Sequence, residues 1–236
     1  MNIPPELQEF KRSAWKPIVQ DGNGLPIDSK FAGTPFIKQD EDYPVCPNCN
    51  NPLQLFLQLD LEKLPEKLGD KFGHGLLQFF YCTNSEPLCE SDCEAYFPFA
   101  KSVLIRILKP ENLTNPKENS FSGSFPPKTI TGWQEMEDFP NWEEGEDLLH
   151  IGLTEEQWDK VNEDGYPHGG DKLSGYPMWI QSIEYPDCPI CGKRMRLLFQ
   201  IDSEDNIPYS FGDVGCGHLT QCEEHKEQLA FGWACS

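Results

Sequence analysis

Two stretches of the chain decide its fold: residues 30–60, KFAGTPFIKQDEDYPVCPNCNNPLQLFLQLD, and residues 172–202, KLSGYPMWIQSIEYPDCPICGKRMRLLFQID. They align without a gap when the first is moved 142 positions along the chain, and 12 of the 31 aligned positions are identical. Each copy holds a Cys-Pro-x-Cys knuckle followed by an apolar run. Two copies at so long a period are typical of a duplicated domain rather than of a solenoid. We therefore predict one internally duplicated domain over residues 1–236, with a first half of about 1–125 and a second half of about 126–236.

The composition indicates a folded protein rather than a disordered acidic chain. Of its 236 residues, 38% are hydrophobic and 12% are aromatic, which is enough to build a substantial core. No apolar run reaches membrane-spanning length, and the N-terminal sequence MNIPPELQEFKRSAWKP contains no apolar signal core. We therefore expect a cytoplasmic protein with no membrane partner, in a compartment where thiols stay reduced. The ten cysteines then favour metal ligation, and a disulfide framework becomes the better interpretation only for an exported chain.

The net charge of -20 limits the classes of partner. Nucleic acids and anionic membranes require clustered Lys and Arg to displace counterions, so we expect neither as a partner. The excess of acidic residues has two remaining interpretations, which are solubility alone or attraction to a basic protein. Residues 135–147 carry seven carboxylates and no basic residue. If this stretch forms a partner surface, its carboxylates should lie together on one exposed face.

Apolar runs predict strands that are buried on both faces. Such runs follow both knuckles, at residues 53–61, 75–82, 101–108 and 195–202. Residues 109–127 are rich in Pro, Asn and Ser and predict a loop between the halves. A capping-box pattern beginning at Thr154 predicts a short helix that runs to about Asn162. The fold class is therefore α+β and β-rich, with two pseudo-twofold halves that share a sheet or pack together.

The repeated knuckles indicate two zinc-ribbon-like sites, each built on cysteines two residues apart. The pairs are Cys46 with Cys49, and Cys188 with Cys191. Each knuckle is followed by a strand and then by a cysteine at the end of a second strand, Cys82 in one half and Cys222 in the other. A redox pair is the usual rival interpretation, but neither knuckle lies between a strand and a long helix.

The fourth ligand differs between the halves. In the second half, His225 lies three residues after Cys222 and completes a set with Cys188 and Cys191. Cys216 falls inside the strand and is interpreted as a buried thiol, and Cys235 has no counterpart. In the first half, Cys89 and Cys93 both follow Cys82, and the sequence does not decide between them, because closure entropies differ little between the two loops. We predict structural zinc, as one or two ions; the alternative is a set of buried cysteines without metal.

Two further pairs of identical residues predict structural roles. Gln58 and Gln200 are expected to satisfy backbone groups at strand ends, and Asp60 and Asp202 are expected to cap the turns that follow. No nucleophile–base signature or phosphate-binding pattern accompanies them, so no catalytic residue is predicted.

The same segments carry a resemblance to a known family. The matching strings begin at about Ser29 and extend over most of the chain: SKFAGTPF, CPNCNNPLQLFLQLDL, GLLQFFYC, ITGWQEMEDFP, DKLSGYP, CPICGKRMRLLFQID and FGDVGCGHLTQC. They resemble the bacterial YwqG-like family of unknown function, and more distantly the eukaryotic programmed-cell-death-2-like proteins. The resemblance implies a duplicated β-rich fold, and the second group implies a chaperone role for a basic ribosomal protein.

Two function hypotheses follow from these observations. The first is a non-enzymatic, zinc-stabilised protein-binding module, chaperone-like or immunity-type, whose acidic surface receives a basic partner. The alternative is a small-molecule enzyme that uses a cleft between the two halves. A deep pocket lined by His, Asp and Arg would favour the enzyme, and a flat acidic face would favour the binding module.

Overall fold

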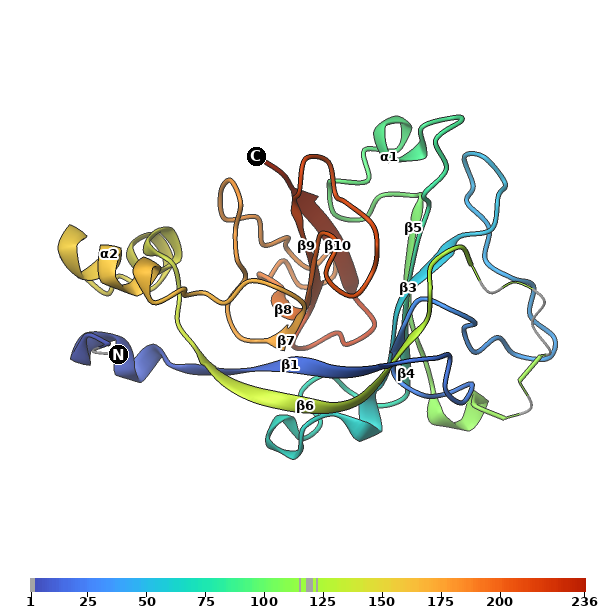
Figure 1. The fold of residues 1–236 in the computed structure, drawn as a ribbon, viewed down its shortest axis with the longest axis horizontal. Coiled ribbons are helices and arrows are strands. Elements are labelled where there is room, and N and C mark those ends of the chain that lie inside the picture. Colours follow the sequence, from blue (N-terminus) through green and yellow to red (C-terminus); the bar gives the residue numbers. More distant parts are fainter. Residues whose placement is uncertain (1–2, 115, 118–120, 122) are drawn as a thin grey trace.

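The computed structural model describes residues 3–114, 116–117, 121 and 123–236 (Figure 1). Its strands are β1 (Arg12–Asp21), β2 (Lys30–Phe31), β3 (Gln54–Asp60), β4 (Leu76–Tyr81), β5 (Val103–Leu108), β6 (Lys128–Asp138), β7 (Lys172–Ser174), β8 (Arg196–Asp202), β9 (Cys216–Gln221) and β10 (Leu229–Ala234). Its helical segments are η1 (Pro5–Phe10), η2 (Leu61–Lys63), η3 (Glu66–Leu68), α1 (Cys89–Asp92), η4 (Pro110–Asn112), η5 (Glu144–Leu148) and α2 (Glu155–Glu163). The chain is therefore β-rich, as its apolar runs predicted.

All ten of these strands belong to one antiparallel sheet, in the order β10-β9-β8-β7-β1-β6-β2-β3-β4-β5. The long strands β1 and β6 pair at its centre, from Arg12 opposite Asp138 to Asp21 opposite Lys128. On its other edge β1 pairs with β7, whereas β6 pairs with β2. β1, from the first half of the chain, therefore extends the group β7–β10 of the second half. β6, from the second half, extends the group β2–β5 of the first half.

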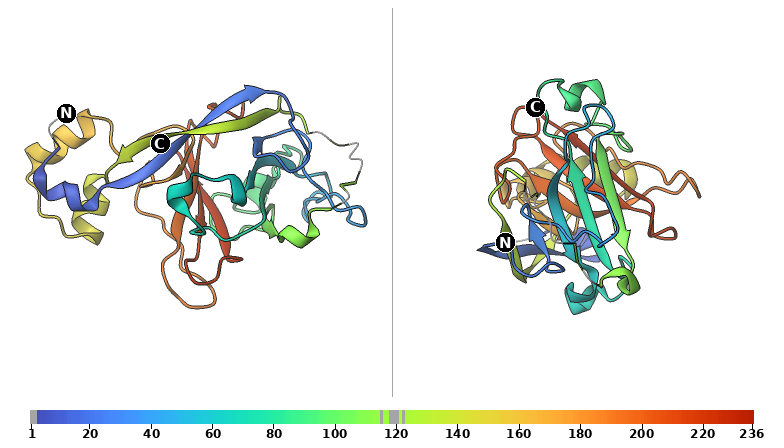
Figure 2. Two further views of the ribbon diagram at one scale, coloured as in Figure 1. Left: turned by 90° about the horizontal axis from the view of Figure 1, so that it is seen from below. Right: turned by 90° about the vertical axis from the view of Figure 1, so that its right-hand side faces the viewer.

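The sheet curls until its edge strands β5 and β10 lie near each other, as the views in Figures 1 and 2 show. The main core lies inside this curl and is rich in aromatic rings, including those of Phe56, Phe79 and Phe231. All residues of β3 and β4 are buried, which explains why these strands carry continuous apolar runs instead of an alternating pattern. The strands predicted after both knuckles are confirmed.

The paired glutamines hold equivalent positions in the two groups of strands. Each side-chain oxygen accepts a hydrogen bond from one backbone N–H, and each side-chain nitrogen donates to two backbone carbonyls. The partners are Phe36, Pro26 and Asp28 for Gln58, and Met178, His168 and Gly170 for Gln200. Each partner pair is separated by the same 142 positions as the glutamines, and the predicted role of these glutamines is confirmed. The duplication as an origin of this correspondence stays a prediction.

The paired aspartates also satisfy turns. Asp60 accepts a hydrogen bond from the backbone of Glu62, and Asp202 accepts from the backbones of Ser203 and Gly170. The capping box at Thr154 is confirmed as well, and α2 begins directly after it. The described residues include no helix that is long and apolar enough to cross a membrane. The predicted loop 109–127 includes residues 115, 118–120 and 122, which lie outside the described residues.

The buried lysines differ in their partners. Lys172 and Asp138 have fully buried side chains, and the Lys172 ammonium lies 2.9 Å from an Asp138 carboxylate oxygen. Asp138 also accepts hydrogen bonds from the backbones of His168 and Tyr176. This carboxylate therefore joins the end of β6 to the start of β7 and the turn after it.

In the first half, no carboxylate of the described residues forms an ion pair with the corresponding lysine, Lys30. Asn23 accepts the hydrogen bond from the backbone of Thr34, and Lys30 donates to the carbonyls of Leu25 and Thr34. Burial lowers the pKa of Lys30 to about 8, with Asp28 acting in the opposite direction. The two halves thus share a framework but differ in charge at one buried position.

Candidate metal centres

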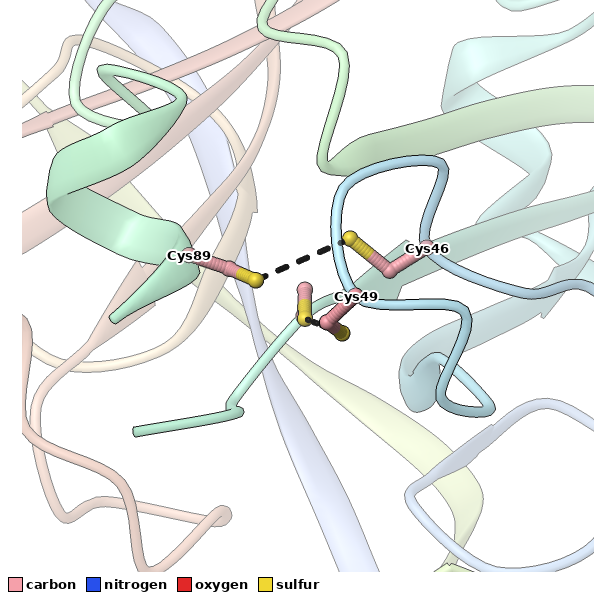
Figure 3. Close-up of side chains that lie close together, drawn as sticks. Cys46, Cys49 and Cys89 are labelled. Carbon is pink, nitrogen blue, oxygen red and sulfur yellow. Dashed lines mark hydrogen bonds between the residues drawn. The ribbon is translucent and has the colours of Figure 1, made fainter. Parts of the chain in front are cut away.

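The first cluster consists of four cysteine sulfurs that lie within 4.8 Å of one another, those of Cys46, Cys49, Cys82 and Cys89. Cys46 and Cys49 lie on the knuckle before β3, Cys82 directly follows β4, and Cys89 begins α1. The sulfurs of Cys46 and Cys89 are 3.9 Å apart, and those of Cys49 and Cys82 are 3.7 Å apart. Figure 3 shows Cys46, Cys49 and Cys89 directed toward a common centre.

The second cluster contains Cys188, Cys191, Cys222 and His225, again with ligand atoms within 4.8 Å of one another. The knuckle before β8 supplies two sulfurs, Cys222 directly follows β9, and His225 lies in the turn before β10. The Nδ1 atom of His225 is 3.8 Å from the Cys188 sulfur and 3.7 Å from the Cys222 sulfur. The two clusters therefore occupy corresponding places in the two groups of strands.

The knuckles fold alike because their backbones form the same hydrogen bonds. The backbone of Cys46 bonds to Asn51 and Asn50, and that of Cys188 bonds to Lys193 and Gly192. Asn50 and Gly192 adopt positive φ angles of 59° and 68°. Glycine adopts this conformation freely and asparagine tolerates it, so each knuckle can turn directly after its second cysteine.

The spacing of the ligand atoms fits tetrahedral coordination. Four sulfurs around an ion with metal–sulfur bonds of about 2.3 Å lie about 3.8 Å apart. The sulfur–sulfur separations of 3.7 and 3.9 Å in the first cluster agree with this value. A disulfide would require about 2.05 Å, and all ten cysteines have free thiols. The donor set of soft thiolates and one imidazole suits a borderline-soft divalent ion.

In the first cluster, burial disfavours the thiolate form of the cysteines when no cation is present. Loss of contact with solvent raises the pKa of Cys82 well above its usual range and raises that of Cys89 to about 11. Two buried thiolates beside two more sulfurs require a nearby cation to compensate their charge. The side-chain amide of Asn48 also lies 3.4 Å from the Cys89 sulfur, where it donates a hydrogen bond.

The structure places the remaining cysteines outside both clusters. Cys93 is buried at the end of α1 but is not among the four sulfurs that come together, so the geometry favours Cys89. Cys216 is fully buried in β9 opposite Asp202, as Leu76 in β4 lies opposite Asp60. Cys235 is partly exposed near the C-terminus.

The acidic stretch 135–147 does not form one exposed face, so that interpretation of its sequence is wrong. Asp138 is buried against Lys172, and Glu144 is 2% exposed. The Glu144 carboxylate accepts hydrogen bonds from the Tyr185 hydroxyl at 3.0 and 3.2 Å, and its burial raises its pKa. Glu146 accepts a hydrogen bond from the indole of Trp158. Nearly half of these carboxylates thus stabilise internal contacts.

Sequence reasoning missed a groove beside the second cluster. It has a volume of about 230 Å³ and is lined by Tyr96, Phe97, Pro98, Trp179, Glu184, Tyr185, Pro186, His218, Thr220 and Gly232. Its walls come from four separate segments of the sequence, so no local motif indicates it. The signal available in the sequence was the group of aromatic residues Tyr96, Phe97, Trp179 and Tyr185. The groove is not lined by the combination of His, Asp and Arg that would favour an enzyme.

Comparison with known proteins gives a family but no activity. Residues 29–232 match the family described as "Domain of unknown function (DUF1963)". Over 68 residues, or 29% of this chain, the sequence is 32% identical to the "Uncharacterized protein YpfL" of Salmonella typhimurium (strain LT2). The match covers 14% of that protein's length. The YwqG-like and programmed-cell-death-2-like resemblances stay predictions.

Proposed function

Because this chain belongs to the DUF1963 family, a domain of unknown function, we propose its role from its own geometry: a cytoplasmic, zinc-stabilised, non-enzymatic module that binds a basic protein. The observation that carries the proposal is that each cluster supplies four protein ligands. A catalytic zinc site keeps a position open for water or substrate, whereas a four-ligand site is closed and structural.

Zinc is the ion that this donor set favours. Soft thiolates and an imidazole in tetrahedral array select it over magnesium and calcium, which prefer oxygen ligands. Each ion would join a knuckle to the end of a neighbouring strand and to the segment that follows it. In this role the metal contributes to folding and takes no part in a reaction.

We expect purified protein to contain up to two equivalents of zinc by elemental analysis. Cys89→Ser should reduce the content by about one equivalent, because it removes one of four ligands from the first cluster. Cys93→Ser is the matched control in the same segment and should retain the full content. Metal-free protein prepared without chelator, or loss of zinc from Cys93→Ser but not from Cys89→Ser, contradicts this assignment.

A basic partner is supported by the charge of the whole chain and by the surface of α2. Glu155, Asp159 and Glu163 are exposed and spaced by four residues, which places them on one face of this helix. Lys160 is the one basic residue within α2. With a net charge of -20, such a face attracts a cationic protein from a distance and accelerates its association.

The partner is tested by the salt dependence of capture. Immobilised protein should retain a basic protein from cell extract at low ionic strength and lose most of it at about 0.5 M salt, where the Debye length falls to about 4 Å. Neutralising Glu155, Asp159 and Glu163 should weaken capture without changing stability, since exposed charges contribute little to folding. Asp40, Glu66 and Asp70 are exposed and, when neutralised, provide an equal change of charge elsewhere. Capture that is insensitive to salt and equal in both variants would refute the basic partner.

A further inference from the structure

The two halves have different residues at one equivalent position on the outer face of the sheet. In the first half this position belongs to Arg106, which lies opposite Gln78 in the pairing of β4 and β5. Its guanidinium donates to the Gln78 side chain at 2.9 Å and forms an ion pair with Glu41. It also lies 5.7 Å from the ring centroid of Phe80. In the first half, a carboxylate, an amide oxygen and an aromatic ring thus surround the guanidinium of Arg106, which belongs to the same chain.

In the second half the equivalent residue is a glycine. His218 lies opposite Gly232 in the pairing of β9 and β10, as Gln78 lies opposite Arg106. On the same face, Thr220 takes the position that Phe80 has in the first half. These replacements by smaller residues create the groove of about 230 Å³ described above. A Cβ atom on Gly232 would lie 3.1 Å from the carbonyl oxygen of Tyr96, so the chain offers little room for an arginine of its own here.

The groove is lined by an acid and by aromatic rings, although at other positions than in the first half, and none of its lining residues is a lysine or arginine. Glu184 lies on its wall, and none of the described residues forms an ion pair or hydrogen bond with its carboxylate. Glu184 is exposed, and the partial loss of solvent around its carboxylate raises its pKa. Trp179 and Tyr185 contact each other edge to face and line the same groove. Arg194 lies 6.0 Å from the Tyr185 ring centroid, and Arg12 lies near the Tyr185 hydroxyl beside Glu144, but neither arginine lines the groove.

The other walls suit a planar cation. The ring of His218 packs 4.5 Å from that of Trp179, and burial lowers the pKa of His218 to about 3, so this wall is neutral. Phe97 is 56% exposed at the mouth of the groove. Guanidinium groups stack on aromatic faces and pair with carboxylates through two parallel hydrogen bonds. Exposed aromatic residues are also typical of protein-binding surfaces.

We propose that this groove binds an arginine side chain of the basic protein partner, which occupies the place that Arg106 fills in the other half. The proposal rests on the proposed function and specifies the residue that the partner presents. Glu184 pairs with the guanidinium, Trp179 and Tyr185 flank its plane, and Phe97 contacts the neighbouring part of the partner.

The test uses the zinc-loaded full chain and the peptide acetyl-Gly-Ser-Arg-Ser-Gly-amide, titrated by nuclear magnetic resonance or calorimetry. We expect the arginine peptide to bind at the groove, with shifts at the indole of Trp179. Replacing its arginine by citrulline, which has nearly the same shape but no charge, should weaken binding about tenfold or more. Glu184→Gln should cause a similar loss and leave folding unchanged, because Glu184 has no internal partner among the described residues.

The chain provides a control at the corresponding position of the other half. Asp42→Asn changes the net charge by the same amount at an exposed site and should bind the arginine peptide like the unmodified chain. Three results would overturn the inference: no binding of the arginine peptide, equal binding of the citrulline peptide, or full binding by Glu184→Gln. If Glu184→Gln still captures a basic protein in a salt-dependent manner, the groove assignment fails while the proposed function stands.

Discussion

Asp138→Ala is expected to lower the free energy of unfolding by about 3–5 kcal/mol, because it breaks a fully buried ion pair. The substitution leaves the Lys172 ammonium without a carboxylate in a site that already lowers its pKa through burial. It also leaves the backbone N–H groups of His168 and Tyr176 without their acceptor. Denaturant unfolding, monitored by tryptophan fluorescence, measures the loss.

The variant Asp138→Asn removes the charge of this side chain but keeps an oxygen that can accept hydrogen bonds, so it measures the contribution of the charge separately. The first half already uses Asn23 as the acceptor at the corresponding place, so an asparagine oxygen should still receive a backbone N–H. We expect Asp138→Asn to be less destabilising than Asp138→Ala, and Asp147→Ala, at an exposed position, to change stability by less than about 0.5 kcal/mol. A loss below about 1 kcal/mol for Asp138→Ala would show that the ion pair is not needed for stability.

Chelation of the zinc that we propose for the two clusters is expected to lower Tm by about 10 °C or more. Structural zinc sites in small domains contribute apparent binding free energies of about 10–16 kcal/mol, which is as large as the stability of a whole domain. A net loss of only about 4 kcal/mol already produces a shift of this size in a chain of this length. Differential scanning calorimetry before and after chelation measures it, and added zinc should restore the original Tm.

Cysteine variants assign the effect to the clusters. Cys188→Ser removes a ligand of the second cluster and should reproduce part of the loss without chelator. Cys235→Ser, at a partly exposed cysteine outside both clusters, should retain the original Tm. Full stability after chelation of a protein that held zinc would refute a structural role for the metal.

The sequence predicted the fully buried strands β3 and β4 and missed the central strands β1 and β6, whose environment is mixed. In β3 and β4 every residue is buried, so their apolar runs were sufficient. β1 and β6 alternate irregularly between buried and exposed residues, and Ile18 in β1 is 50% exposed. Their stability comes from pairing with each other, which no local pattern records.

The candidate site shows the same division. The repeat and the spacing of the cysteines predicted which sulfurs come together, because a knuckle is a local structure. The choice of Cys89 over Cys93 depended on how α1 lies against β4, which loop length cannot determine. Glu144 was interpreted as a surface acid because its partner Tyr185 is 41 residues away. The groove could not be predicted from the sequence, because it is recognised only when the pairing of β9 with β10 is compared with that of β4 with β5.

The exchange of central strands also governs the order in which a ribosome can complete this molecule. β1 leaves the ribosome early, but both of its neighbours, β6 and β7, come from residues 128–174. The pair between Ala14 and Ser174 closes a loop of about 160 residues, so its entropic cost is met only late in synthesis. Until β6 has emerged, β1 presents two unpaired edges, and one edge stays unpaired until β7 has emerged, a state in which nascent chains are prone to aggregate and to bind chaperones. The ten-stranded sheet can therefore be completed only after Leu229–Ala234 has been synthesised.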